Sequence, residues 1–455
     1  MDTGKWQIIP GAKRLIRSLR DMGYEFSAAV ADLIDNSIEA RANTIRIDVE
    51  WDGEESYVMI SDNGLGMTAG QIREALKFGA ERDYDAEDLG KFGLGLKTAS
   101  LSQCLRLTVA SRQNENRADI NAYCWDLDHV DATNKWEILQ VKTGDLPSKA
   151  KQYLKEAPGT VVVWERIDRI LGYKRPDGEF ARKQLINMCR GLEEHIAMVF
   201  HRFLAGEVRG KRLAIYLNEN KVIPWDPFAR NESFTQRLEQ VVVRVDTEKG
   251  KSDVVIEPFV LPPQSKFSTP DAFNRSSGPS KWNRQQGFYI YRADRMIQSG
   301  GWSNLRTLDE HHKLARVALS FSPRLDDDFK INVPKMRVAL PASIRDDIAK
   351  AIGPVVTIAN RAYRSNEKTE RAAGKSNGTP VGETPNKSID TTGNGKESND
   401  PRNTRAPGLS GGGSATSSKG MDFGDLELLL ERVALPEELP VIKKVVARAK
   451  ASITE

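Results

Sequence analysis

The spacing of apolar residues predicts how the first third of the chain is built. Between Ala29 and Ile38, apolar side chains recur every three to four positions, which predicts a helix with one buried face. Residues 44–51 and 56–64 are rich in strand-forming residues and are separated by polar ones, which predicts a β-hairpin. Helical and strand patterns alternate up to residue 175, so residues 1–175 are expected to form an α/β domain.

The pattern changes along the rest of the chain. Residues 180–204 have helical spacing, whereas strand patterns dominate from about residue 211 to residue 345. The segments with strand patterns are 212–220, 240–245, 252–261, 286–297 and 330–340. A further helix is expected over 341–363, so residues 211–363 are predicted to form a second α/β domain, which residues 176–210 connect to the first.

The C-terminal part has a different composition. No Phe, Trp or Tyr occurs between Arg364 and Gly420, where Gly, Ser, Thr, Asn, Pro and charged residues dominate. Such a segment buries too little apolar surface to offset its chain entropy, which predicts a disordered linker over 364–420. Residues 421–455 combine an acidic start, a Leu-rich run and a basic second half, which predicts a short helical tail.

Composition favours a protein of the cell interior. The chain has 455 residues, 39% hydrophobic and 29% charged, as expected for two or three globular domains. It shows neither an apolar run of about 20 residues nor a signal peptide, which predicts a cytoplasmic protein, or a nuclear one in a eukaryote. The three cysteines have no spacing typical of disulfides or metal ligands. The net charge of +4 permits contact with nucleic acid without requiring it.

Two polar side chains on the first predicted helix are candidates for chemistry. Asp32 and Asn36 are one turn apart and are therefore neighbours on the helix surface. An acid can activate a water molecule, and an amide oxygen can hold Mg²⁺. The alternative is a solvated polar face, which the helix taken alone favours.

A glycine-containing turn follows the predicted hairpin. Asp62 is expected where the second strand stops, and its carboxylate there can accept a hydrogen bond from an exocyclic amine. Gly64 and Gly66 leave room for a flat ring beside the backbone, and Met67 can pack on that ring. The alternative is an ordinary turn, because many turns contain Asp and Gly.

Later segments of the chain indicate a phosphate-binding loop, a lid and the start of a further strand. The glycines of residues 90–95 precede a predicted helix, and free backbone amides at the start of a helix can bind phosphate. Their spacing is neither that of a P-loop nor that of a Rossmann fold. Residues 79–90 are polar and flanked by glycine, which is typical of a lid, and Gly159-Thr160 opens a strongly β-forming run.

Together these motifs resemble the GHKL ATPase superfamily, which includes gyrase-type topoisomerases, MutL, the ninety-kilodalton heat-shock chaperones, histidine kinases and MORC proteins. The four motifs, in chain order, are Asp32-x-x-x-Asn36, Asp62-x-Gly64-x-Gly66, Gly93-x-Gly95 and Gly159-Thr160. The amino-acid sequences of these motifs are most similar to those of MORC-type proteins and then to those of MutL. The resemblance implies a Bergerat α/β sandwich, with helices on one face of a mostly antiparallel mixed sheet.

The resemblance also implies roles for individual residues. Asn36 would coordinate Mg²⁺ bound to the ATP phosphates, and Asp62 would accept a hydrogen bond from the adenine amino group, assisted by Thr160 through a water. The implied lining of the adenine pocket is Gly64, Gly66 and Met67. The implied phosphate contacts are Gly90, Lys91, Phe92, Gly93, Leu94, Gly95, Leu96 and Lys97.

The hydrolytic base departs from the family pattern. Relatives usually carry Glu four residues before the Mg²⁺-binding Asn, whereas this chain has Asp32 there. Aspartate is one methylene shorter, so Asp32 is expected to act on a shifted water or to give slow turnover.

Residues 286–302 resemble a strand-turn-strand of the transducer (S5-type) domain of MutL and MORC proteins. In that domain Lys335, or alternatively Lys330, would reach the γ-phosphate.

The resemblance implies an ATPase that works as an ATP-gated clamp, in which nucleotide promotes homodimerisation and hydrolysis reopens the dimer. Duplex DNA is the expected target, in a setting such as restriction or phage defence. Trp282 and the cations of residues 265–286 are either phosphate contacts or part of an ordinary surface loop. The alternative is a chaperone-like or scaffold ATPase that acts on protein partners, and residues 421–455 are expected to bind a partner.

Two histidines on the predicted connecting helix raise the question of a histidine kinase. His195 and His201 follow the ATP-binding segment, whereas a phosphoacceptor in that family precedes it. They are therefore interpreted as partly buried or interface histidines.

Overall fold

The computed structural model describes residue 8 and residues 10–21, 23–79, 95–113, 119–247, 250–331 and 338–375. Several sequence predictions lie outside these ranges, namely the phosphate contacts Gly90, Lys91, Phe92, Gly93 and Leu94, the γ-phosphate lysine Lys335 and the tail at 421–455. Within the described ranges, no helix has both the length and the hydropathy needed to span a membrane.

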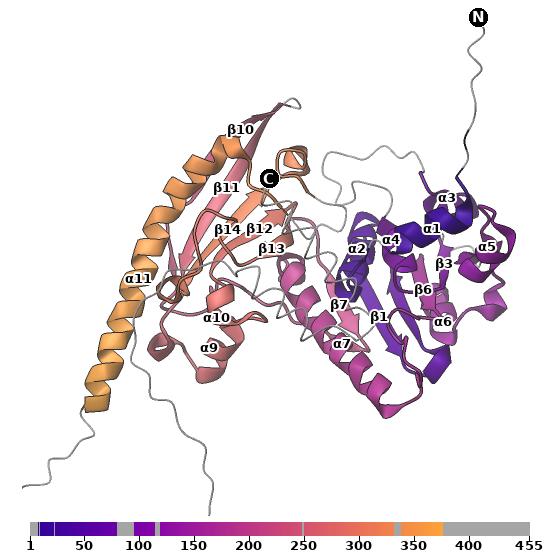
Figure 1. The fold of residues 1–455 in the computed structure, drawn as a ribbon, viewed down its shortest axis with the longest axis horizontal. Coiled ribbons are helices and arrows are strands. Elements are labelled where there is room, and N and C mark those ends of the chain that lie inside the picture. The colour runs from indigo at the N-terminus through magenta and orange to yellow at the C-terminus, as the bar shows by residue number, and fades with distance from the viewer. Residues whose placement is uncertain are drawn as a thin grey trace, which may run out of the picture. The chain divides into compact units, whose positions relative to one another are not determined.

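A mixed eight-stranded sheet forms the first domain (Figure 1). In sheet order its strands are β5 (Leu139–Gln140), β4 (Asn121–Asp126), β3 (Arg106–Arg112), β6 (Gly159–Glu165), β2 (Tyr57–Asp62), β1 (Thr44–Glu50), β7 (Ala214–Leu217) and β8 (Asn220–Lys221). All neighbours run antiparallel except β1 and β7, which are parallel. The predicted α/β class with a mostly antiparallel mixed sheet is confirmed.

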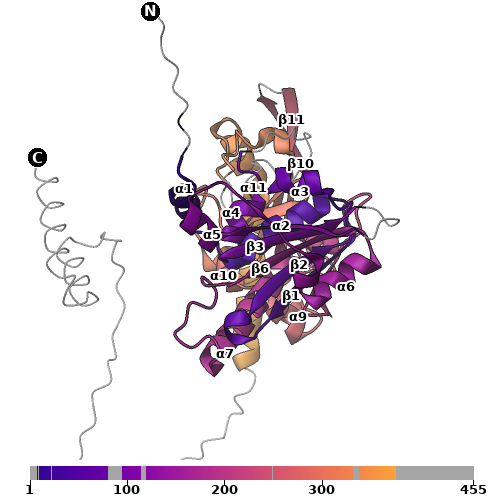
Figure 2. The same ribbon diagram turned by 90° about the vertical axis from the view of Figure 1, so that its right-hand side faces the viewer.

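Helices cover both faces of this sheet. They are α1 (Ala12–Arg20), α2 (Phe26–Glu39), α3 (Ala69–Leu76), α4 (Gly95–Leu101), α5 (Leu127–Thr133), α6 (Ser148–Glu156), α7 (Glu179–Val199) and α8 (His201–Leu204), with 3₁₀ turns at Gly53–Glu55 and Thr143–Asp145. Helices α2 and α6 lie on opposite faces (Figure 2). The expectation of helices on one face alone is thereby corrected, because α6 buries a second, smaller apolar layer.

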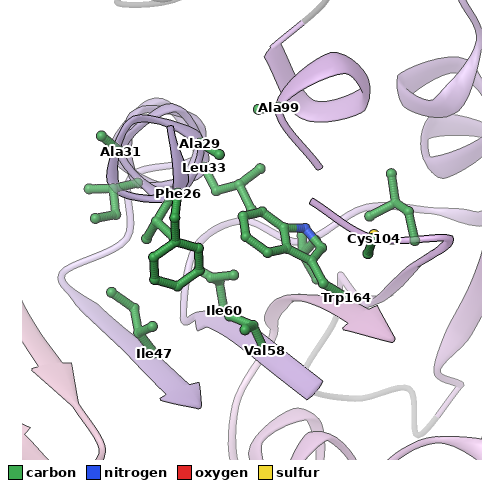
Figure 3. Close-up of a cluster of buried hydrophobic side chains, with 14 of the residues drawn as sticks. Phe26, Ala29, Ala31, Leu33, Ile47, Val58, Ile60, Ala99, Cys104 and Trp164 are labelled. Carbon is green, nitrogen blue, oxygen red and sulfur yellow. The ribbon is translucent and has the colours of Figure 1, made fainter. Parts of the chain in front are cut away.

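Strand β6 shows why both faces are covered. Its side chains alternate between faces, as they do in any strand. Val162 and Trp164 join the large core with α2, whereas Val161 and Val163 join the small core under α6. Trp164 meets Phe26 of α2 edge-on, with ring centroids 6.2 Å apart (Figure 3). This packing fixes α2 against the centre of the sheet.

A second sheet with one long helix forms the rest of the described chain. Its strands, in order, are β10 (Val241–Thr247), β11 (Gly250–Val260), β14 (Ala315–Phe321), β12 (Gly287–Arg292) and β13 (Arg295–Ser299), and β9 (Gln236–Arg237) also pairs with β11. The helices are α9 (Pro270–Ser276), α10 (Lys281–Arg284) and α11 (Arg345–Lys375), with 3₁₀ turns at Gln264–Lys266, Glu310–His312, Pro323–Leu325 and Ala342–Ile344. Helix α11 buries Ile348, Ile352 and Val355 against this sheet.

Three features differ from the sequence predictions. Strands β7 and β8 extend the first sheet, although the sequence placed residues from 211 onward in the second domain. Strand β14 was not predicted, and α11 continues to Lys375, past the predicted start of the linker at Arg364. Periodicity identifies a strand but not the sheet that it joins. The extension of α11 is rich in Lys, Arg, Glu and Ala, which have high helix propensity.

The segment 265–286 is folded rather than a loop. It contains α9 and α10, and Trp282 stacks on Phe273 with ring centroids 4.6 Å apart. The buried guanidinium of Arg316 lies 5.3 Å from the centroid of the Trp282 ring. The interpretation of this segment as a loop that offers Trp282 to a partner is therefore corrected, because the indole packs inside the second domain.

A buried histidine joins α8 to the second sheet. His201 is 1% exposed, and its Nε2 lies 2.8 Å from the Tyr291 hydroxyl. Burial first, and then the positive charge of Arg202, lower the pKa of His201 to about 3. The interpretation of His201 as an interface histidine agrees with this position.

This histidine is expected to make stability depend on pH. An unfolded His201 gains a proton near pH ~6.5, whereas the folded residue stays neutral until about pH 3, so the unfolded state binds more protons between these values. The free energy of unfolding should therefore fall as pH drops, by about 1.4 kcal/mol per pH unit. Urea unfolding at pH ~6, ~5 and ~4 measures this slope. His201→Gln, which keeps a hydrogen-bonding group, should reduce this slope by the share of His201 and leave the share of His195, whose pKa is lowered to about 4. An equal slope in both proteins would contradict the prediction.

Candidate functional site

Helix α2 presents neighbouring polar side chains in different directions. Successive residues are about 100° apart around a helix, so each meets different surroundings. Asn36 is exposed, whereas Asp32 is only 3% exposed and Ser37 also 3%. A Cβ atom built on Gly95, the first residue of α4, would lie 3.4 Å from Oδ2 of Asp32. Asn36 thus faces solvent, and Asp32 faces the start of α4.

Asp62 ends β2, and its carboxylate is held from two sides. The Ser37 hydroxyl donates to Oδ2 at 3.0 Å, and the backbone N–H of Gly64 donates to Oδ1 at 2.9 Å. Burial raises the pKa of the Asp62 carboxyl, while hydrogen bonds from Gly64, Ser37 and the Thr160 backbone oppose the rise. Asp62 is therefore a fixed, partly buried acceptor at the strand end, the position that the sequence predicted.

Glycines allow backbone segments to meet closely around Asp62. Gly66 has φ +65°, and a Cβ atom there would lie 2.1 Å from the Arg112 carbonyl oxygen. Gly159 has φ +152°, and its Cβ would lie 1.9 Å from the carbonyl oxygen of Asp62. A Cβ on Gly64 would lie 2.6 Å from the carbonyl that follows α2. No larger residue fits at these positions, so these glycines have a packing role in addition to their predicted contact with a ring.

A serine that belongs to none of the predicted motifs connects two of them. The Ser111 hydroxyl accepts from the backbone N–H of Met67 at 2.8 Å and donates to the Gly159 carbonyl at 2.6 Å. It also lies 3.0 Å from the Thr160 hydroxyl, which can donate to it. Ser111 therefore fixes the turn after β2 against the start of β6. Nothing local marks it, because it is one serine among the residues of β3.

The described part of the predicted phosphate loop begins at Gly95. Leu96 is partly buried against the main core. Lys97 is 2% exposed, and its ammonium donates to the Ala75 carbonyl at 2.9 Å. Burial lowers the pKa of Lys97 to about 8. The ammonium has further N–H donors besides the one that binds this carbonyl, and its predicted contact with a phosphate stays a prediction.

Of the two lysines considered for the γ-phosphate, the structure describes Lys330. It is exposed and has φ +50°, a left-handed conformation that is uncommon outside glycine. Its N–H donates to the Asp327 carbonyl at 3.3 Å. The preceding turn is anchored by Asp326, whose carboxylate accepts two bonds from Arg292 at 2.7 and 2.8 Å. The roles of Lys330 and Lys335 stay predictions.

The polar groups at this site fit a magnesium ion that a nucleotide brings with it. Among the described residues, no group of three or more His, Cys, Asp or Glu side chains could hold a metal ion. Mg²⁺ keeps several waters and often takes one or two protein ligands together with substrate phosphates. The exposed Asn36 amide on α2, one turn from Asp32, offers an oxygen of the type that such an ion accepts.

The motifs fall within one recognised family region. Residues 24–160 match the family of histidine kinase-, DNA gyrase B- and HSP90-like ATPases. This region belongs to the GHKL ATPase superfamily. The GHKL region contains Asp32, Asn36, Asp62 and Thr160, and it begins at Tyr24 just before α2.

Part of the chain is also similar to bacterial mismatch repair proteins. DNA mismatch repair protein MutL of Fervidobacterium nodosum is 25% identical over 190 residues, which cover 38% of this chain and 32% of MutL. MutL of Haemophilus influenzae is 35% identical over 94 residues, covering 20% of this chain and 15% of MutL. MutL of Thermosipho africanus is 26% identical over 191 residues, which cover 38% of this chain and 33% of that MutL. The chain therefore spans about a third or less of these relatives.

Proposed function

We propose that the protein binds ATP with Mg²⁺ at the site built from α2, the turn after β2 and the start of β6, and hydrolyses it. The arrangement of α2 carries this proposal, because one helix supplies an exposed amide at Asn36, a buried acid at Asp32 and the hydroxyl that orients Asp62. Phosphate release by the full chain, compared with and without magnesium, is the direct test. Release that does not depend on magnesium would overturn the proposal.

Asp62 is proposed to select adenine. Its carboxylate is a hydrogen-bond acceptor whose position is fixed by Ser37 and Gly64. Adenine presents an exocyclic amine that can donate to it, whereas guanine presents a carbonyl at the corresponding position. Thr160 pairs with Asp62 across β6 and β2, so its hydroxyl can support a bridging water.

Asp32 is proposed to act as the general base. In hydrolysis, a water oxygen bonds to the γ-phosphorus, the bond to the β-phosphate oxygen breaks, and the water proton passes to the Asp32 carboxylate. Bound magnesium would neutralise charge on the phosphates. Lys335, or Lys330, is proposed to contact the γ-phosphate, and closure of the residues around 90–94 would complete the phosphate site.

We further propose that ATP binding closes a homodimer and that the second domain acts on duplex DNA. The segment 265–286 supports the DNA proposal by its charge. Its exposed cations are Lys266, Arg275, Lys281 and Arg284, and its acid is Asp271. Exposed Lys and Arg contact DNA phosphates and release counterions. The matched relatives are named as DNA mismatch repair proteins, which agrees with this direction.

The DNA proposal predicts a salt-dependent response. Duplex DNA should raise the rate of ATP hydrolysis, and DNA affinity should fall as salt increases. Replacing both Lys281 and Arg284 with Ala should reduce the slope of log affinity against log salt by about 2, since each phosphate contact contributes about 1. The matched control replaces Lys155 and Lys221, two exposed lysines of the first domain, with Ala. Equal slopes in both double variants would contradict this assignment, and no response to DNA at all would favour a protein partner.

A further inference from the structure

A short hairpin of the second domain reaches the helix that carries Asp32. Strands β12 and β13 are joined by Ala293 and Asp294, with φ of +46° and +66°. Positive φ at both positions is typical of a tight two-residue turn. The next residue, Arg295, donates from Nε to Oδ1 of Asp35 at 2.9 Å. This contact crosses 260 positions of sequence and connects helix α2 to strand β13 of the second sheet.

The same guanidinium also lies beside Asp32. The Nη2 atom of Arg295 is 3.9 Å from Oδ1 of Asp32. Asp32 lies about one helical turn before Asp35 on α2. The side chains of Arg295, Asp32 and Asp35 are 3%, 3% and 1% exposed. The cation therefore stands in the interior, where a carboxylate is costly unless a positive charge accompanies it. Arg295 therefore compensates the two buried acids of α2, Asp32 and Asp35, at once.

Other contacts hold the hairpin tip in this position. Arg292 pairs with Arg295 across the hairpin. Its Nε and Nη2 atoms donate to the two carboxylate oxygens of Asp326. Asp294 accepts a hydrogen bond from Arg202 of α8 at 3.0 Å. Three residues near the tip therefore bind three different elements, so a displacement of the second domain would move Arg295 relative to α2.

The surroundings of Arg295 suit a guanidinium group. The Phe200 ring lies 5.8 Å from its central carbon, which suits a planar, weakly hydrated cation. Burial first, and then the charge of Arg295, lower the pKa of the neighbouring His195 to about 4. Lysine would retain the charge but offers a point donor rather than a fork that can face two carboxylates.

We propose that Arg295 is a positioning residue for Asp32, so that ATP hydrolysis, but not ATP binding, depends on docking of the β12–β13 hairpin against α2. This inference rests on the proposed function of Asp32. It assigns to the second domain a role in turnover that does not involve contact with the nucleotide.

The test uses the full chain with Arg295→Met and Arg295→Lys. Without the guanidinium, Asp32 loses its fixed position, and a small misplacement of a reacting group can cost about 100-fold in rate. Arg295→Met should therefore lower kcat by about 10- to 100-fold and leave the ATP affinity, measured by calorimetry, within about twofold. Hydrogen exchange of the α2 amides should become faster without nucleotide. Arg295→Lys should recover part of kcat and most of the exchange protection.

Asp35→Asn provides the matched variant, because it weakens the same contact from the helix side. It should lower kcat in the same direction, and the Arg295→Met, Asp35→Asn double variant should lose much less than the product of the two single effects. Unchanged kcat in Arg295→Met would overturn the inference, as would a parallel loss of ATP affinity and kcat. Wild-type protein that binds ATP without hydrolysing it would instead overturn the proposed hydrolysis and, with it, the inference.

Discussion

Asp32→Asn should bind ATP as tightly as the wild type and hydrolyse it about 100- to 10,000-fold more slowly. The amide keeps the size of the side chain beside Gly95 but cannot take a proton from water. Single-turnover assays with saturating protein measure the chemical step, and calorimetry measures the affinity. An unchanged single-turnover rate would show that Asp32 is not the base.

Glu39→Gln is the control for this variant. Glu39 is the last residue of the same helix, about 10 Å along the axis from Asp32. Its replacement changes the charge of α2 by the same amount as Asp32→Asn. Hydrolysis should stay within about twofold of the wild-type rate, and a comparable fall in both variants would indicate a general effect of charge on α2.

Asp62→Asn should weaken ATP binding by about 30- to 150-fold, which corresponds to about 2–3 kcal/mol for a hydrogen bond to a buried charged acceptor. The substitution preserves shape, and the asparagine oxygen can still accept from the Gly64 N–H. In Asp62→Asn the amide nitrogen replaces a carboxylate oxygen that accepts hydrogen bonds. This nitrogen can only donate, so it cannot accept from the Ser37 hydroxyl or from the adenine amine. The selectivity for ATP over GTP should fall in the same variant, which competition binding measures.

Asp48→Asn separates this effect from a loss of folding. Asp48 is 2% exposed on β1 and is paired with Lys149 of α6, away from the site around Asp62. Its loss also removes a buried carboxylate from the first sheet. ATP affinity in Asp48→Asn should remain near that of the wild type once the fraction of folded protein is taken into account. If both variants lost affinity equally, Asp62 would have no special part in binding adenine.

The local parts of the site could be predicted because their residues are close in sequence. The spacing of apolar residues predicted the helix α2, although the structure buries the consecutive residues Ala28–Asp35 and so covers more than the one predicted face. The polar turn after residue 62 marked the end of β2. Asp32 and Asn36 follow from one helical turn. These features depend on backbone geometry over a few residues, so the spacing of residues in the sequence is enough to predict them.

Contacts between distant segments could not be predicted in the same way. Ser111 joins Met67 to Gly159, and Arg295 meets Asp35, through folding of segments that no local pattern brings together. Lys97 shows the same limit. A lysine beside a glycine-rich loop suggests a phosphate contact, but its four-carbon chain also reaches the end of α3, where the structure places its ammonium.

The two domains are connected through more than the chain between them. His201 meets Tyr291, Arg202 meets Asp294, and Arg295 meets Asp35, so both α8 and α2 contact the β12–β13 hairpin. A nucleotide that favours one arrangement of α2 would thereby favour one position of the hairpin, and the reverse also holds. This connection gives a physical route by which bound ATP could control the DNA contact that we propose for the second domain.

Calorimetric titration of ATP with magnesium into the full chain is the most direct measurement of the nucleotide site. We expect one nucleotide bound per chain, with an affinity that Asp62→Asn weakens and Asp48→Asn does not. Folded wild-type protein that takes up no adenine nucleotide, or that binds ATP equally well with Asn at position 62, would contradict a site built on α2 and the end of β2.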